Sequence, residues 1–368
     1  MGYGIFRNEL ETLKKYVPGK PIEEVKREYG LTDIVKLASN ENPLGPSPMA
    51  IEAIREEAVN VHIYPESMAP KLRNALAEEL NIDAEGILLG NGGEEILKFI
   101  AQTFVNTGDE AIMGKPSFGL YNISVSHMGG TCVEVPLTDR FEHDLDTFLE
   151  KVTDKTKLVY VCNPNNPTGN IMSADKINAF VDKLPEHPVL VLDEAYYDFA
   201  IRNPEYPDGL EILKRRKNTI ILRTFSKVAG LAAVRVGYCI SHPEIIAEMT
   251  KVKGVFNCNR LAQVAGVAAL KDKDHLKNTV DLNYQSLDLM IDCFNRNNLD
   301  FIPSNANFIW AKSPISSKDL YEFMLREGVI MRPGFLWGQD EWFRVSTGTV
   351  EQTERFVKVL EKILKDHA

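Results

Sequence analysis

The alternation of short apolar runs with amphipathic helical segments between residues 157 and 222 constrains the fold most strongly. The apolar runs cover 158–162, 189–192 and 219–222, and the helical segments between them cover 174–183 and 210–216. Such a series builds a parallel sheet with helices on both faces, because each strand needs a crossover to lie beside the previous one. Runs that are apolar throughout indicate strands buried on both faces. We therefore predict an α/β fold with a mostly parallel sheet.

Polar clusters follow each of these three strands. They are Asn163–Gly169, Asp193–Tyr196 and Thr224–Lys227. In open parallel sheets ligands bind beyond the carboxyl ends of the strands, so we predict that the three clusters meet at one edge. Lys227 opens a loop of small residues that ends at Arg235. An amine that loses hydration at an apolar edge has a lowered pKa and becomes a nucleophile. Taken by itself, Lys227 is better explained as a surface lysine that extends its ammonium group into water, and only the other residues can reverse this interpretation.

A glycine-rich turn between an apolar run and a helix is a candidate phosphate site. Residues 87–89 read as a strand, and Gly90–Glu95 opens a helix that carries apolar residues on one face. A helix N-terminus offers free N–H groups and the positive end of the helix dipole, which together hold a phosphate. The alternative is a tight strand-to-helix turn that uses glycine for its conformation alone. The spacing is not that of a dinucleotide-binding fingerprint.

Charge and composition exclude several classes of protein. The formal net charge is −10 and the pI is near 5.4, whereas nucleic-acid binding requires a clustered basic face. The five cysteines form no CxxC pair and have no histidines at metal-ligand spacing, so we expect reduced thiols and no metal site. We find neither a secretion signal nor an apolar run of about 18 residues. We therefore expect a cytoplasmic protein with no nucleic-acid or membrane partner.

The residue types at the predicted sheet edge match what a pyridoxal 5′-phosphate enzyme needs. Lys227 would hold the cofactor as a Schiff base and later move protons as general base and acid. Asp193 would pair with the pyridine nitrogen and keep it protonated, so that negative charge at the substrate's α-carbon spreads into the ring. Asn166 and Tyr196 would donate hydrogen bonds to the phenolate oxygen of the cofactor. The predicted catalytic residues are Lys227, Asp193 and Tyr196.

The other predicted cofactor contacts concern the phosphate and the ring face. Backbone N–H groups of the glycine turn would bind the phosphate, together with the Ser226 hydroxyl and the Arg235 guanidinium. The guanidinium is permanently charged and has the fork shape that suits an oxyanion. Phe118 would stack on the ring. The residues of the glycine turn that would contact the phosphate are Gly92, Gly93 and Glu94.

Taken together, these motifs resemble the fold-type-I aminotransferases, and within them the histidinol-phosphate aminotransferase group. The resemblance covers nearly the whole chain. The segments that carry it are Ser39–Pro43, Tyr64–Pro65, Gly90–Glu95, Cys162–Gly169, Asp193–Tyr196, Ser226–Lys227 with Arg235 eight positions later, and Phe343–Thr349. The sequence departs from the family pattern at two places, because the family commonly has a tyrosine at the position of Phe118 and a bulkier residue where Ala229 and Gly230 stand.

The resemblance implies a definite architecture. We expect a large domain with a mostly parallel seven-stranded sheet flanked by helices, a smaller α+β C-terminal domain and an N-terminal arm. In this chain the arm would cover 1–35, the large cofactor-binding domain 36–255 and the small domain 256–368. The arm would pack with the small domain or with the partner subunit. The family forms homodimers with active sites at the subunit boundary, and Tyr64 matches the residue that reaches the partner's cofactor phosphate.

The resemblance also implies the substrate contacts. Arg344 matches the arginine that binds the substrate's carboxylate, and in this group it would also meet the phosphate of histidinol phosphate. Tyr16 lies where the group folds a tyrosine over the substrate as a lid. Asn166 and Asn42 are the remaining residues expected to contact substrate.

The implied activity is a ping-pong transfer of an amino group from histidinol phosphate to 2-oxoglutarate in histidine biosynthesis. Two alternatives use the same motifs: an aromatic amino-acid aminotransferase and a threonine-phosphate decarboxylase, which protonates the carbanion instead of transferring nitrogen. A non-catalytic protein of the same fold would not need Lys227. A P-loop NTPase is excluded, because the chain contains no GxxxxGK[S/T] loop.

Overall fold

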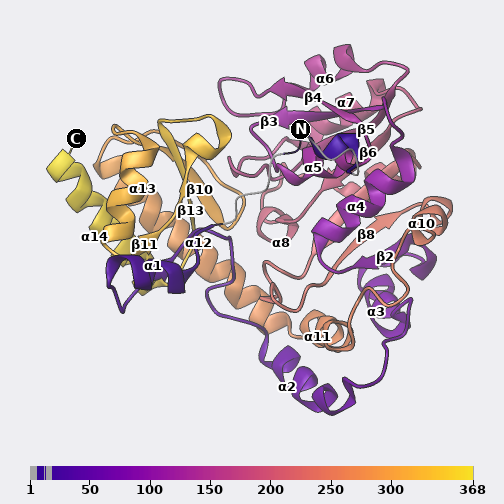
Figure 1. Cartoon of the computed structure of the whole chain (residues 1–368), viewed down its shortest axis with the longest axis horizontal. Helices are drawn as coiled ribbons and strands as arrows, with labels where there is room; N and C mark the ends of the chain where they lie inside the picture. Colours follow the sequence, from indigo (N-terminus) through magenta and orange to yellow (C-terminus); the bar gives the residue numbers. More distant parts are fainter. Residues whose placement is uncertain (1–5, 12, 14–18, 368) are drawn as a thin grey trace.

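The computed structural model describes residues 6–11, 13 and 19–367. The chain forms two lobes, a large one that holds most of the first 270 residues and a smaller one that holds the C-terminal part (Figure 1). Among the helices of the described residues, none is long and apolar enough to cross a membrane. Tyr16 lies outside the described residues.

The large lobe is built on a seven-stranded sheet with the order β2-β8-β7-β6-β5-β3-β4. Only β8 runs antiparallel to its two neighbours, and the other pairs are parallel. This confirms the predicted α/β fold with a mostly parallel sheet. The strands are β2 (Ile87–Gly90), β3 (Glu110–Lys115), β4 (Thr131–Pro136), β5 (Thr156–Cys162), β6 (Val189–Asp193), β7 (Thr219–Thr224) and β8 (Gly237–Ser241).

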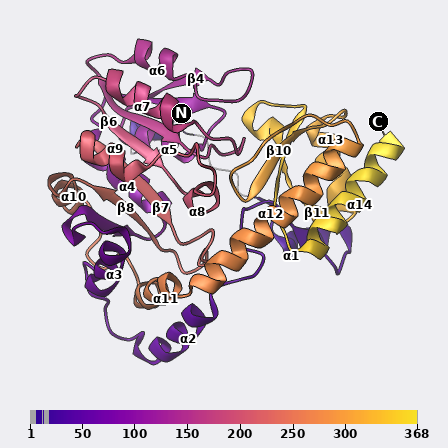
Figure 2. The same cartoon turned by 180° about the vertical axis from the view of Figure 1, so that it is seen from behind.

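The central strands are buried on both faces because helices cover each side of the sheet (Figures 1 and 2). In β5, Val159 and Val161 pack into one core, whereas Leu158 and Tyr160 pack into the other. Helices α4, α5 and α10 cover the second core, and α3, α6, α7, α9 and α11 cover the first. The helices of this lobe are α2 (Pro48–Glu57), α3 (Pro70–Leu80), α4 (Gly93–Phe104), α5 (Leu120–His127), α6 (Leu145–Lys151), α7 (Ala174–Lys183), α8 (Tyr197–Ala200), α9 (Gly209–Arg215), α10 (Pro243–Thr250) and α11 (Arg260–Lys271), with the 3-10 turns η2 (Ala58–Asn60) and η3 (Ala84–Gly86).

The smaller lobe contains an antiparallel four-stranded sheet with the order β12-β13-β10-β9. Its core lies between this sheet and the helices α12, α13 and α14. The elements are α12 (Lys273–Arg296), β9 (Phe301–Ile302), β10 (Phe308–Lys312), α13 (Ser317–Arg326), β11 (Val329–Ile330), β12 (Arg332–Pro333), η4 (Gly334–Trp337), β13 (Trp342–Ser346) and α14 (Val350–His367).

The N-terminal segment joins the two lobes. The turn η1 (Asn8–Leu10) packs against α5 of the large lobe. Helix α1 (Ile22–Tyr29) packs against α13, and β1 (Val35–Lys36) pairs in parallel with β11. Helix α13 and strand β11 both belong to the smaller lobe. The chain then crosses between the lobes toward α2 in the large lobe (Figure 1).

Helix α11 follows the predicted limit between residues 255 and 256 and packs on the large lobe. Ala262, Ala265 and Ala269 belong to the core of the large sheet, and α11 packs against α2 and α3. Asp272 ends α11, and its side chain accepts a hydrogen bond from the His275 N–H and so caps α12. Helix α12 then runs for 24 residues from the large lobe into the smaller one (Figure 2). Helix α12 therefore connects the two lobes.

Candidate active site

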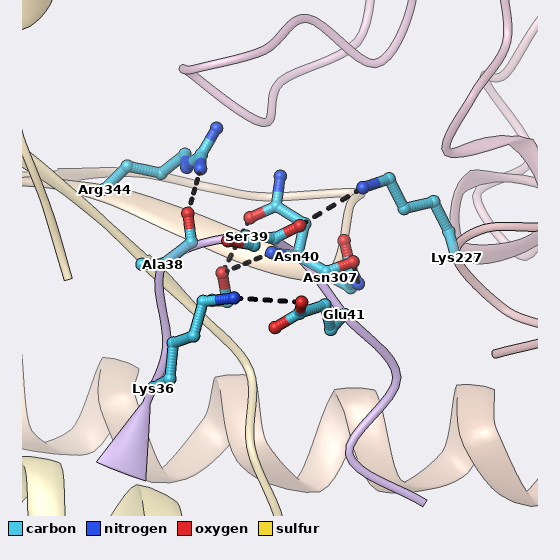
Figure 3. Close-up of polar contacts among 9 residues, drawn as sticks. Lys36, Ala38, Ser39, Asn40, Glu41, Lys227, Asn307 and Arg344 are labelled. Carbon is cyan, nitrogen blue, oxygen red and sulfur yellow. Dashed lines mark hydrogen bonds and ion pairs between the residues drawn. The ribbon is translucent and has the colours of Figure 1, made fainter. Parts of the chain in front are cut away.

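The three predicted polar clusters lie side by side because their strands are neighbours in register. Cys162, Asp193 and Leu222 are paired across β5, β6 and β7. The loops that follow these residues therefore leave the sheet at one edge. Segment 36–41 enters the same place from the N-terminal side, between Lys227 and Arg344 (Figure 3).

The amine of Lys227 is partly buried and lies within the site. Its Nζ atom is 3.3 Å from the backbone oxygen of Ser39 and 5.7 Å from the ring centroid of Tyr196. Burial lowers the pKa of Lys227 to about 8, and the nearby positive charge of Arg344 acts in the same direction. Near pH 8 the Lys227 amine is therefore neutral in about half of the protein molecules, and the neutral amine can act as a nucleophile.

Asp193 is buried and receives two hydrogen bonds. The Tyr121 hydroxyl donates to Oδ2 over 2.6 Å, and the backbone N–H of Ala195 donates to Oδ1 over 3.1 Å. Burial raises the pKa of the Asp193 carboxyl, and the hydrogen bond from Tyr121 opposes that shift. The sequence analysis does not single out Tyr121, because a tyrosine in an apolar helix segment has no pattern that distinguishes it from packing.

The Tyr196 hydroxyl accepts hydrogen bonds from two amides. Asn40 Nδ2 donates over 2.9 Å and Asn166 Nδ2 over 3.3 Å. Burial raises the pKa of Tyr196, so the phenol keeps its proton and can donate it to a third group. The structure thus brings Asn166 and Tyr196 together as predicted and adds Asn40, which lies in the motif Ser39–Pro43.

Asn42 of the same motif faces away from Tyr196. Its Nδ2 atom donates to the backbone oxygen of Val228 over 2.8 Å and to the Thr279 hydroxyl over 3.0 Å. The side chain therefore ties the loop after Lys227 to helix α12. Its amide nitrogen is used within the protein, whereas the neighbouring Asn40 reaches the site.

The predicted phosphate contacts gather at the N-terminus of α4. Gly92 has a φ of 85°, and a Cβ atom there would overlap the guanidinium of Arg235. That guanidinium donates to the backbone oxygen of Ala232 over 2.9 Å. Gly93 lies against the backbone of Gly237 in strand β8. Gly237 is the register partner of Thr224 in strand β7. The Thr224 hydroxyl donates to Ser226 Oγ over 3.0 Å. A guanidinium, a hydroxyl and a helix N-terminus thus lie in neighbouring segments, and these are groups that can bind a phosphate.

Arg344 projects into the site from β13 of the smaller lobe. It donates to Asn166 Oδ1 over 2.5 Å and to the backbone oxygen of Ala38 over 2.7 Å (Figure 3). Its guanidinium lies 5.2 Å from the ring centroid of Phe308 and 5.4 Å from that of Trp337. A buried arginine held in this way is a ready binding group for a carboxylate or phosphate.

A second arginine stands directly opposite Arg344. Arg332 of β12 is its register partner, and its guanidinium lies 5.7 Å from the same Trp337 ring. Arg332 is 9% exposed and Arg344 5% exposed. The sequence analysis does not identify Arg332, because the pairing of β12 with β13 depends on the intervening turn η4.

The remaining predicted residues lie at the margin of the site or outside the described residues. Phe118 is partly buried and packs edge-on against Tyr121, with ring centroids 5.6 Å apart. Tyr64 is 76% exposed and stacks on Phe256 at 4.6 Å. Glu94 extends its side chain to Lys98, so only its backbone remains for a phosphate. Tyr16 belongs to the part of the chain that is not described.

The small residues after Lys227 have a structural reason. Gly230 has a φ of 68°, and a Cβ atom at this position would overlap the backbone of Gly45 and Pro46. Ala229 is buried in the core of the large sheet. The close approach of Gly45 and Pro46 therefore explains Gly230, and burial in the core explains the small side chain of Ala229.

The chain is similar to known proteins over nearly its whole length. The sequence model of the family described as "Aminotransferase class I and II" matches residues 32–360. A histidinol-phosphate aminotransferase of Moorella thermoacetica is 44% identical over 97% of this chain and 92% of its own length. Another, of Caldicellulosiruptor saccharolyticus, is 40% identical over 98% of this chain and 100% of its own. The crystal structure of the Sinorhizobium meliloti histidinol-phosphate aminotransferase in complex with pyridoxal-5′-phosphate is 29% identical, covers 100% of this chain and 99% of its own, and superposes with a TM-score of 0.91.

Proposed function

Because this chain belongs to the class I and II aminotransferases, we propose that it uses pyridoxal 5′-phosphate to transfer the amino group of histidinol phosphate to 2-oxoglutarate. The residues at the sheet edge fit the cofactor: an amine with a lowered pKa, a buried carboxylate and a phosphate cradle. When bound, the cofactor supplies an electron-withdrawing ring that stabilises negative charge at the substrate's α-carbon.

The protein's own groups would each act at a defined place. Lys227 would hold the cofactor and then, as a free amine, carry the proton to and from the substrate's α-carbon. Asp193 would keep a proton on the pyridine nitrogen, and the Tyr196 hydroxyl would donate to the cofactor's phenolate oxygen. Arg235, Ser226 and the N-terminus of α4 would bind the phosphate.

The arginine pair Arg332 and Arg344 carries the choice of substrate. Arg332 and Arg344 are register partners in neighbouring strands, and both residues are nearly buried. Two guanidiniums at paired positions could together donate several charge-assisted hydrogen bonds to one phosphate dianion. Histidinol phosphate supplies such a dianion, whereas an aromatic amino acid supplies only one carboxylate. The pair therefore favours histidinol phosphate over phenylalanine.

The substrate assignment is tested by half-reactions of the enzyme with histidinol phosphate, phenylalanine and phosphothreonine, each added alone. We expect Arg332→Gln to weaken the reaction with histidinol phosphate by about ten- to a hundredfold, the loss typical of hydrogen bonds to a charged group. The reaction with phenylalanine should change far less. Lys312→Gln is the control, because it removes an exposed charge from the same sheet.

Three outcomes would count against the substrate assignment. Equal losses with both amino donors would show that Arg332 does not recognise phosphate. Equal wild-type rates with phenylalanine and histidinol phosphate would favour the aromatic aminotransferase. Release of CO₂ from phosphothreonine would favour the decarboxylase.

The active protein would be a homodimer in which Tyr64 completes the partner's phosphate site. Tyr64 is one of a group of exposed apolar residues next to the proposed phosphate site. Asn257, in the loop that also carries Phe256, donates to the Leu89 backbone and to Glu95. Lys253 donates to the Ser67 backbone and to the Gly254 backbone, which fixes the two loops of this surface. An exposed apolar surface of this kind marks an interaction site. Its members are Val59, Val61, Ile63, Tyr64, Val255 and Phe256.

The dimer is tested by mixing two variants. In a hybrid of Lys227→Ala and Tyr64→Phe protomers, one site has Lys227 from one subunit and Tyr64 from the other. We expect the exchanged mixture to be more active than the average of its two parents and to regain wild-type cofactor affinity in some of its sites. A monomer in sedimentation experiments, or a mixture that only averages its parents, would contradict the proposal.

A further inference from the structure

The hydroxyl of Tyr121 is aimed at the carboxylate that the proposed function places at the pyridine nitrogen. The Tyr121 side chain is fully buried, and its hydroxyl donates to Asp193 Oδ2 over 2.6 Å. The other oxygen, Oδ1, accepts the Ala195 N–H over 3.1 Å. Each carboxylate oxygen therefore has one donor from the protein, and each keeps a lone pair for another partner.

The ring of Tyr121 packs against two other aromatic rings, which restrict the position of its hydroxyl. It stacks on Tyr160 with ring centroids 4.5 Å apart and an interplanar angle of 9°. Phe118 packs edge-on against the Tyr121 ring. Burial raises the pKa of Tyr121 well above its ordinary value, and the nearby charge of Asp193 acts in the same direction. The phenol therefore remains a donor throughout the working pH range.

Tyr160 offers a matched comparison within the same stack. Its side chain is equally buried, but its hydroxyl makes no hydrogen bond to the described residues. Tyr121 and Tyr160 thus share burial and ring packing, and they differ in whether the hydroxyl reaches Asp193.

Several ionisable groups face Asp193 and act on its protonation together with Tyr121. Lys227 lowers the pKa of Asp193, whereas burial raises it. The ionisable groups around Asp193 are Tyr121, Tyr160, Cys162, Glu194, Tyr196 and Lys227. Among them, Tyr121 donates directly to the carboxylate.

We propose that Tyr121 is a positioning residue whose hydroxyl orients the Asp193 carboxylate and favours its ionised form at the site of the cofactor's pyridine nitrogen. The role rests on the proposed function of Asp193. Without this hydrogen bond the buried carboxylate would protonate more easily and turn more freely. It would then pair less well with a protonated ring nitrogen.

The test measures binding of pyridoxal 5′-phosphate to the apoenzyme in Tyr121→Phe and in the control Tyr160→Phe. We expect Tyr121→Phe to weaken binding by about ten- to a hundredfold, as for the loss of one hydrogen bond to a charged group. In the pH profile of cofactor affinity, the loss of affinity on the acid side should move to higher pH, because the Asp193 carboxyl of this variant protonates at higher pH. Tyr160→Phe should leave both properties unchanged. Equal cofactor affinities and pH profiles in the two variants would overturn the inference.

A double-mutant cycle separates this inference from the proposed function. In the Asp193→Asn background, Tyr121→Phe should cause no further loss of cofactor affinity. If Asp193→Asn alone changes neither cofactor affinity nor turnover, the role proposed for Asp193 is wrong. If Asp193→Asn impairs both while Tyr121→Phe behaves like wild type, only the role of Tyr121 is wrong.

A fluorinated tyrosine at position 121 provides a second test if Tyr121→Phe does not fold. Its more acidic phenol is a stronger donor, so we expect tighter cofactor binding and a loss of affinity on the acid side at lower pH. No change in either property would also overturn the inference.

Discussion

Replacing Lys227 with alanine should lower turnover by at least about a thousandfold, because general acid–base catalysis alone contributes about 10²–10⁴-fold. The substitution also removes the amine that would hold the cofactor. That amine has a pKa of about 8 and is therefore partly neutral near physiological pH. The measurement is the steady-state rate with histidinol phosphate and 2-oxoglutarate, together with the cofactor absorbance of the purified protein.

Lys214→Ala is the control for this prediction. Lys214 lies on helix α9, and its exposed ammonium group pairs with Glu211 over 2.5 Å. A surface ion pair of this kind contributes little, so turnover should remain near that of the wild type. Turnover of Lys227→Ala within a few fold of the wild type would refute the assignment of Lys227.

Replacing Arg344 with glutamine should lower kcat/KM by about a hundred- to ten-thousandfold, since two hydrogen bonds from a charged donor to the substrate's anionic group would be lost and each is worth about 1.5–3 kcal/mol. The loss should appear mainly in KM if Arg344 binds the substrate's anionic group. The substitution also leaves the Ala38 carbonyl and Asn166 without this donor, so thermal stability should fall as well. Steady-state kinetics and thermal unfolding give the two measurements.

Arg344→Lys distinguishes charge from geometry. It keeps the positive charge but cannot form the forked pair of hydrogen bonds, so we expect it to recover only part of the lost affinity. Arg344 also lowers the pKa of Lys227. In Arg344→Gln the Lys227 amine should therefore titrate at higher pH, and cofactor uptake by the apoenzyme should need a higher pH than in Arg344→Lys. A KM unchanged in both variants would contradict the substrate role.

The sequence predicts those site residues that follow directly from strand ends. Asp193 follows its apolar run directly and Lys227 lies in the loop after the next one, and the two runs are neighbours in a parallel sheet. Their meeting is therefore a consequence of topology alone. The resemblance adds Arg344 and Tyr64, which lie far from these strands in the sequence.

The residues that sequence analysis does not find depend on contacts between distant segments. Asn40 reaches Tyr196, whereas Asn42 turns toward α12, and a left-handed φ of 56° at Asn40 accompanies this difference. Tyr121 is distinguished from an ordinary core tyrosine only by its hydrogen bond to Asp193. Arg332 becomes a site residue only through its register with Arg344. None of these contacts has a local sequence pattern.

The sequence pattern also does not determine to which lobe some segments belong. Helix α11 is rich in alanine, which permits the close packing seen against α2 and α3. Its apolar face fits either lobe equally well by pattern. Val35 and Leu37 likewise belong to the core of the smaller lobe, although they precede the large lobe in the chain. Only the pairing of β1 with β11 determines their place.

The most direct test of the central claim is to find which residue holds the cofactor. The holoenzyme is reduced with borohydride, which fixes pyridoxal phosphate on the amine that carries it, and the digested protein is analysed by mass spectrometry. We predict that the peptide containing Ser226 and Lys227 carries the added mass on Lys227 and that Lys227→Ala yields no labelled peptide. A label on a different lysine, or the same label in Lys227→Ala, would contradict the account.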